Sequence, residues 1–150
     1  MELSEKRKQH IEYIVNEVYQ KSCNEYSFED FAREYKIHRI KESDFGDLTY
    51  EFSSVSLNIN GEYAIIINDK LKTEERKEIM GHELGHILLG HVKQMNVNAD
   101  MPVKSGMIEP DTPEEFTEAN YFKQLWCDRF SNSGWINYEK IKDLKIVPIS

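Results

Sequence analysis

The chain has 150 residues, which is enough for one domain with a hydrophobic core and too few for two comfortable ones. Its formal net charge of −8 argues against sequence-independent binding to nucleic acid or to an anionic membrane surface, because both require a basic surface. No run approaches the roughly 18 apolar residues of a membrane span, and the N-terminus lacks the apolar region of a secretory signal. Cys23 and Cys127 do not make a disulfide framework, so we expect a cytoplasmic protein.

Two helices are expected first. Ser4 precedes a helix of about residues 4–21, whose apolar residues recur at i, i+3, i+4 and i+7: Ile11, Ile14, Val15 and Val18. Ser27 resembles the cap of a second, short helix with apolar residues at helical spacing from Phe28 to Tyr35. The period then changes to two, and Ile37 to Ile40 predict a first strand.

A turn signal at 43–47 is followed by alternating apolar residues at 48–59, which predict a strand with an interruption near Ser53 and Ser54. Asn60 and Gly61 form the strongest hairpin signal, because both turn positions need a positive φ. The run 62–67 is the most β-like in the chain, and we expect it to be a central strand.

A helix of about residues 73–90 is expected next, with Thr73 as its N-cap and Gly90 at its end. Residues 92–111 have no clear period and predict a long loop lining a cleft. Thr112, with Pro113 and Glu115, marks the start of a helix of about 113–130. Its expected apolar side is Phe116, Ala119, Phe122, Leu125, Trp126 and Phe130. The tail from residue 135 predicts a short helix and an extended apolar end.

The main chemical signal is His82-Glu83-Leu84-Gly85-His86. On a helix, positions four apart lie on one face, so both imidazoles can point at one metal ion, and neutral imidazole suits Zn²⁺. Glu83 lies beside the first histidine, where a general base could take a proton from water. The competing interpretation, a chance match on a buried helix, is disfavoured by the glycines that bracket the histidines.

Other candidates have simpler explanations. His91 lies nine residues after His82, one short of the spacing for a third histidine ligand. We therefore expect His91 to be a residue at the helix C-terminus rather than a ligand. His10 and His38 fall on predicted polar faces. Cys127 lies beside apolar residues and is expected to be a buried thiol rather than a nucleophile.

His-Glu-Leu-Gly-His together with Glu118-Ala119-Asn120-Tyr121-Phe122 resembles the ImmA/IrrE family of metallopeptidases. The hairpin, the strand ending at Asn68 and the helix leading into the motif are also similar to that family, so that the resemblance covers roughly residues 26–130. The family commonly reads E-x-E-A-N-x-F-A, and its first Glu is the expected metal ligand. In this chain that position is Phe116 and the last is Lys123.

Catalytic zinc sites usually take three protein ligands, and the motif supplies two. The following helix offers Glu114, Glu115 and Glu118. Glu118 matches the second Glu of the family pattern. Glu115 lies one residue before the usual ligand position and has another expected task as the capping-box partner of Thr112. We therefore predict Glu118 as the third ligand, with Glu115 as the alternative; a water or a loop histidine could also complete the site.

These observations predict one α+β domain over residues 1–150. The resemblance implies a zincin-like fold with a small, mostly antiparallel sheet packed with helices and the motif on a central helix. It also implies a zinc-dependent endopeptidase in which His82 and His86 hold the metal and Glu83 is the base. Its substrate would be a protein, such as a cognate DNA-binding repressor of a mobile element or stress response, with no direct nucleic acid or membrane binding. The alternative, motivated by Phe116, is a metal-binding or catalytically impaired module that binds a repressor or toxin.

Overall fold

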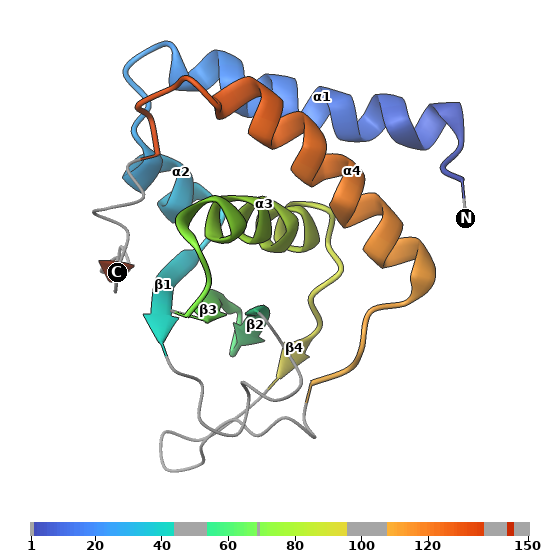
Figure 1. Cartoon of the computed structure of the whole chain (residues 1–150), viewed down its shortest axis with the longest axis vertical. Coiled ribbons are helices and arrows are strands. Elements are labelled where there is room, and N and C mark those ends of the chain that lie inside the picture. Colours follow the sequence, from blue (N-terminus) through green and yellow to red (C-terminus); the bar gives the residue numbers. More distant parts are fainter. Residues whose placement is uncertain (1, 44–53, 69, 96–107, 137–143, 146–150) are drawn as a thin grey trace.

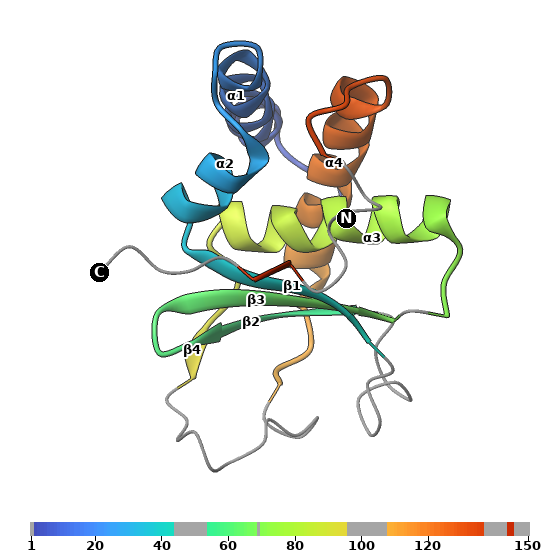
Figure 2. The same cartoon turned by 90° about the vertical axis from the view of Figure 1, so that its left-hand side faces the viewer.

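The computed structural model of the chain describes residues 2–43, 54–68, 70–95, 108–136 and 144–145. Helix α3 (Thr73–Leu88) lies against one face of a small sheet and is covered on its other side by the longer helices (Figure 2). Helices α1 (Glu5–Ser22) and α4 (Pro113–Phe130) cross at an angle above α3 (Figure 1). Helix α2 (Phe28–Glu34) connects α1 to the sheet. The predicted α+β class is confirmed, and α3 is the central helix.

Three helices begin with caps that the sequence predicts. Ser4 accepts a hydrogen bond from the backbone of Arg7, and Ser27 forms a capping box with Asp30. Thr112 forms the expected capping box with Glu115, and Pro113 occupies the first turn. The N-cap of α3 is Lys72 rather than Thr73, without a side-chain cap; Thr73 is helical and its hydroxyl accepts from Arg76. The prediction at this helix was wrong by one residue.

The sheet has the strand order β4-β2-β3-β1-β5 among the residues described. Its strands are β1 (Ile37–Ser43), β2 (Ser54–Ile59), β3 (Glu62–Asn68), β4 (Gln94–Met95) and β5 (Leu144–Lys145). Strand β3 is central, as predicted, and is joined to β2 by the expected hairpin, in which Asn60 and Gly61 have φ of 55° and 92°. The sheet is mixed rather than mostly antiparallel, because β1 pairs with β3 and β2 with β4 in parallel.

The order of the strands along the chain explains why β1 and β3 are parallel. The hairpin reverses the chain after β2, and β1 lies on the other side of β3 and runs in the same direction as β3.

Strand β4 falls inside residues 92–111, where only a loop is expected, because two residues are too few for an alternating pattern. The predicted turn at 43–47, the strand portion 48–53 and most of the tail lie outside the described residues.

The hydrophobic core lies between the sheet, α3 and the paired helices. Its largest fully buried side chains include Trp126, Phe31 and Phe122. Phe116, predicted on the apolar side of α4, is 51% exposed. Its ring lies against the imidazole of His82, with centroids 5.3 Å apart, because the first turn of α4 passes the metal motif rather than the core. No helix in the described part of the chain is both long and apolar enough to cross a membrane.

Gly85 allows α3 and α4 to approach closely. A Cβ placed at this glycine would lie 3.0–3.1 Å from side-chain atoms of Phe122, which is fully buried and has little room to move. We expect Gly85→Val to lower the free energy of unfolding by about 1–3 kcal/mol through overpacking. Thermal unfolding in the presence of a chelator would measure this. Gly134→Ala is the control, since a Cβ there meets no atom within 4 Å; an equal loss in both variants would contradict the argument.

The two cysteines differ in accessibility, and both are free. Cys23 is exposed, whereas Cys127 is half-buried on α4, and burial followed by the nearby charge of Glu78 raises the pKa of its thiol. Because the thiolate is the reactive form, we expect a disulfide reagent to modify Cys23 first and Cys127 much more slowly. Mass spectrometry of the labelled chain would follow both sites. Labelling in denaturant should make the two rates similar, and equal rates in the folded chain would contradict the prediction.

Candidate metal centre

Helix α3 brings the two predicted histidines together. His82 and His86 are one turn apart, and their Nε2 atoms are 3.0 Å from one another. The rings meet edge to face with centroids 4.6 Å apart. His86 is buried and His82 is half-buried, so both nitrogens face a protected volume rather than bulk solvent.

Asp111 is the third group at this point, and it comes from the segment just before α4. Its Oδ2 lies 3.0 Å from Nε2 of His86 and 3.9 Å from Nε2 of His82. The three possible ligand atoms lie within 4.8 Å of one another. Two imidazoles and a carboxylate form a typical donor set of a catalytic zinc site. Hydrogen bonding to His82 and then to His86 holds the pKa of the Asp111 carboxyl well below its usual value.

The amide of Asn120 fixes the orientation of His82. Its Oδ1 lies 2.9 Å from Nδ1 of His82, and an amide oxygen can only accept a hydrogen bond. Nδ1 of His82 therefore carries the proton. In the neutral ring Nε2 is then left with a free lone pair, which points toward His86 and Asp111.

A second series of hydrogen bonds fixes His86. Nε2 of His91 lies 2.8 Å from Oε1 of Glu118, and because a carboxylate accepts, this nitrogen carries the proton. Nδ1 of neutral His91 is consequently an acceptor, and it lies 2.9 Å from Nδ1 of His86. His86 must donate there, so its own Nε2 also presents a lone pair to the site.

These tautomers test whether the residues suit a metal. Two imidazole lone pairs and a carboxylate oxygen converge, and such a group is electrostatically unfavourable unless a cation lies among them. At Nε2 of His86 a proton competes with a metal ion: burial lowers the pKa of His86, but the hydrogen bond that the protonated ring donates to Asp111 and the charges of Glu83, Asp111 and Glu115 outweigh it and raise that pKa. A site that attracts a proton in this way suits a divalent cation, and the donor set fits zinc.

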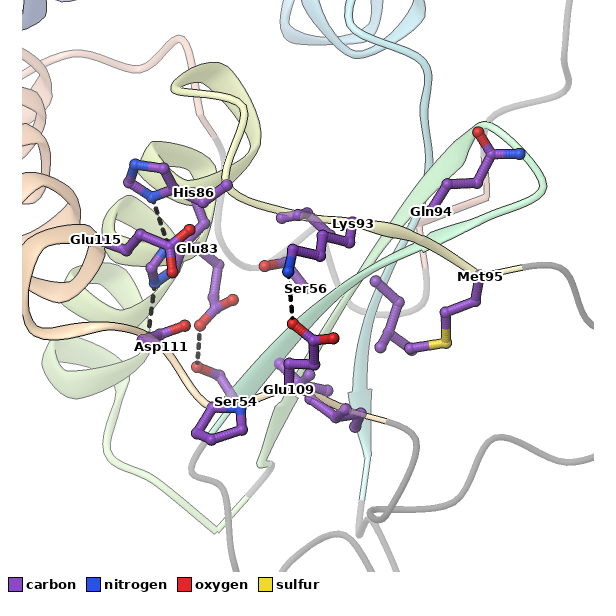
Figure 3. A pocket seen from close by; sticks show the side chains of 16 residues that line it. Ser54, Ser56, Glu83, His86, Lys93, Gln94, Met95, Glu109, Asp111 and Glu115 are labelled. Carbon is purple, nitrogen blue, oxygen red and sulfur yellow. Dashed lines mark hydrogen bonds and ion pairs between the residues drawn. The ribbon is translucent and has the colours of Figure 1, made fainter.

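Glu83 lies next to the histidines and outside the ligand group. Glu83 is 6% exposed, and its carboxylate accepts a hydrogen bond from the hydroxyl of Ser54, at 3.0 Å. Glu83 and Ser54 line the same cavity as His86 and Asp111, and their side chains face it (Figure 3). The hydrogen bond leaves the second carboxylate oxygen able to accept a proton from a water molecule in the cavity.

The cavity has a volume of about 320 Å³ and lies between β2 and two connecting segments. One wall is formed by residues 91–95 and the opposite wall by residues 108–111, which confirms the predicted cleft for these parts of the loop. The exposed ion pair between Lys93 and Glu109 joins the two walls at 2.8 Å (Figure 3). His86 and Asp111 of the metal group thus line this cavity together with Glu83.

The structure places neither predicted third ligand in the metal group. The carboxylate of Glu118 is buried and is occupied by Arg7 and His91. Oε1 of Glu115 accepts from the backbone nitrogen of Thr112, the capping task expected for it. Both residues lie on α4, but the side chain of Glu118 points toward α1 and that of Glu115 points back to the N-cap residue Thr112. Among the described residues, Asp111 is the acid that lies with the two histidines.

The sequence contained partial signals for the missed residues. Asp111 immediately precedes the N-cap Thr112 and ends the segment 92–111, for which the sequence predicts a loop. Asn120 is the asparagine of the Glu-Ala-Asn pattern, and its contact with His82 explains why an amide is useful there. Ser54 falls in an interrupted strand and carries no spacing signal that could identify it as a partner of Glu83.

A family model named the IrrE N-terminal-like domain, Peptidase_M78, matches residues 33–135. The chain belongs to this family. The predicted family is therefore confirmed, and the fold and the site lie in a metallopeptidase-like domain. The match includes α3, the described cavity walls and the whole of α4, while α1 lies outside it. No curated protein and no solved structure significantly matches the chain.

Proposed function

We propose that the chain is a zinc-dependent endopeptidase that hydrolyses a peptide bond in a protein substrate. The convergence of the Nε2 atoms of His82 and His86 with the Asp111 carboxylate carries this proposal. Glu83 lies beside that group and faces the same cleft. Membership of a peptidase family supports the reaction class.

In this proposal His82, His86 and Asp111 hold the metal ion. When bound, zinc polarises a carbonyl oxygen and makes water more acidic. Glu83 takes a proton from the attacking water as the new carbon–oxygen bond forms, and it donates that proton to the amine nitrogen as the carbon–nitrogen bond breaks. The hydroxyl of Ser54 keeps the Glu83 carboxylate directed into the cleft during both transfers.

The proposed substrate is a segment of another protein, such as a DNA-binding repressor of a mobile element or stress response. The net charge of −8 favours a basic protein partner and disfavours direct binding of this chain to DNA. A reducing cytoplasm is part of the proposal, and the two free cysteines support it.

A second candidate function is supported by Phe116. The family pattern usually has a ligand Glu at this position, and here a half-exposed aromatic ring lies on His82 instead. A metal-binding module without peptidase activity would act by binding a repressor or toxin partner. The two candidates share the metal and differ in the use of Glu83.

The test uses the purified chain, zinc analysis and a proteome-derived peptide library read by mass spectrometry. The endopeptidase predicts one zinc per chain, together with cleavage that a chelator removes and added zinc restores. Stoichiometric zinc without cleavage of the library or of intact repressor proteins would favour the second candidate. A chain that binds no zinc would contradict both.

A further inference from the structure

Arg7 connects the first helix to the metal centre although α1 lies outside the family match. Its Nε and Nη2 donate to the two carboxylate oxygens of Glu118, at 2.9 and 2.8 Å. This bidentate pair holds a planar guanidinium against a planar carboxylate, so it fixes the direction of the carboxylate as well as its charge. Helices α1 and α4 cross at an angle in the same layer (Figure 1) and are in contact.

Glu118 passes this constraint toward the metal ligands. Its side chain is only 6% exposed, and the oxygen that accepts from Arg7 Nη2 also accepts from Nε2 of His91. His91 in turn accepts from Nδ1 of His86, at 2.9 Å. An unbroken series of hydrogen bonds therefore runs from α1 to a nitrogen of a metal-ligand ring.

We propose that Arg7, Glu118 and His91 are positioning residues of the metal centre, and that the docking of α1 on α4 through them sets its metal affinity. This inference rests on the proposed function, because it requires a metal ion held by His82, His86 and Asp111. It also explains why Glu118 is buried outside the ligand group, since its carboxylate links Arg7 to His91.

The physical argument follows the hydrogen bonds outward. His91 can accept from His86 only while its own proton points at Glu118, and a buried carboxylate needs its cationic partner to remain in place. Without Arg7, Glu118 gains by turning toward solvent, and the ring of His91 is then free to rotate. His86 would lose the partner that fixes its tautomer, and its Nε2 lone pair would be directed at the metal for less of the time.

Coupling of this kind is reciprocal. If the docking of α1 strengthens metal binding by some factor, metal binding strengthens the docking of α1 by the same factor. The metal-loaded chain should therefore protect the amide hydrogens of α1 from exchange better than the metal-free chain does. None of the proposed ligands lies on α1, so this protection would reach α1 through the intervening residues.

The experiment measures zinc affinity by chelator competition and records the visible spectrum of the Co²⁺-substituted chain for four variants. Outer partners of metal-ligand histidines typically contribute about 10–100-fold in affinity. We expect Arg7→Ala to lose about tenfold, Arg7→Lys to recover part of that loss, and Glu118→Gln to lose at least as much as Arg7→Ala, with altered Co²⁺ absorption in the weakened variants. The matched control is Tyr121→Phe, which removes another hydrogen bond between α1 and α4, from Tyr121 to Glu12 at 2.6 Å, without touching the series.

Thermal unfolding of each metal-free variant shows whether it is folded. Wild-type affinity and an unchanged Co²⁺ spectrum in Arg7→Ala would overturn this inference alone, and so would an equal loss of affinity in Tyr121→Phe. If Arg7→Ala fails to fold, Arg7→Lys and Glu118→Gln decide the question by the same readouts. A wild-type chain that binds neither Zn²⁺ nor Co²⁺ would overturn the proposed function as well.

Discussion

Replacing Glu83 with Gln is expected to reduce peptide cleavage by about 10²–10⁴-fold, the usual contribution of a general base, while zinc binding stays close to that of the wild type. Gln has nearly the same shape and can still accept the hydrogen bond from Ser54, but it cannot take a proton from water. The loss should therefore appear in kcat far more than in KM. Cleavage of a peptide identified from the library, with zinc measured in the same sample, would check both parts.

Ser54→Ala is the matched control for Glu83→Gln, because it removes the hydrogen bond and keeps the base. One hydrogen bond to a charged group is worth about 1.5–3 kcal/mol, so its loss should reduce cleavage by much less than the loss of the base itself. Full activity in Glu83→Gln would remove Glu83 from the mechanism. Loss of zinc in that variant would instead show that this carboxylate supports the metal group.

The parts of the fold that depend on local spacing were predictable. Ser4, Ser27 and Thr112 cap their helices because side-chain oxygens next to helical sequence satisfy free backbone donors, which requires no tertiary information. The same is true of Asn60 and Gly61 in the hairpin. The pairing of His82 with His86 depends only on helical geometry, and it too follows from four-residue spacing.

The contacts that complete the site join distant parts of the chain. Arg7 and Glu118 are 111 positions apart, and no periodicity links them. The choice of Glu118 as a ligand assumed that the acid matching the family pattern would face the motif, but the angle of α4 directs it to α1. Nothing in the spacing distinguishes Asp111 from the other acids around the helix start, because it lies in a loop without a period. Only packing could show that this turn ends beside the histidines.

Parallel pairing in the sheet was hidden for a related reason. Alternation shows that β1, β2 and β3 are strands, but it does not give the direction in which they pair. That direction depends on the crossover between β1 and β3, part of which lies in residues 44–53, outside the described structure. The hairpin signal at Asn60 predicts only that β2 and β3 are antiparallel, and it says nothing about the pairing of β1.

Asp111→Ala is expected to weaken zinc binding by more than about 100-fold, beyond the 10–100-fold typical of outer partners, because it removes a ligand and its charge. Folding should be little affected, since the side chain of Asp111 is 43% exposed and outside the core. Chelator competition measures the affinity, and Glu118→Gln provides the comparison. A larger loss in Glu118→Gln than in Asp111→Ala would restore the ligand assignment made from the sequence.

The position of Phe116 offers a sharper form of this test. Its ring lies on His82, so an acid placed there would start close to the metal group, at the position where the family pattern usually has a ligand Glu. We expect Phe116→Glu, added to Asp111→Ala, to recover much of the lost zinc affinity, whereas Phe116→Gln should recover far less because it lacks the charge. Recovery would mean that a carboxylate at position 116 can replace the one at position 111 in the metal group, with the same two histidines. Failure of both double variants would mean that the position of Asp111, and not merely a third negative charge, is required for the metal.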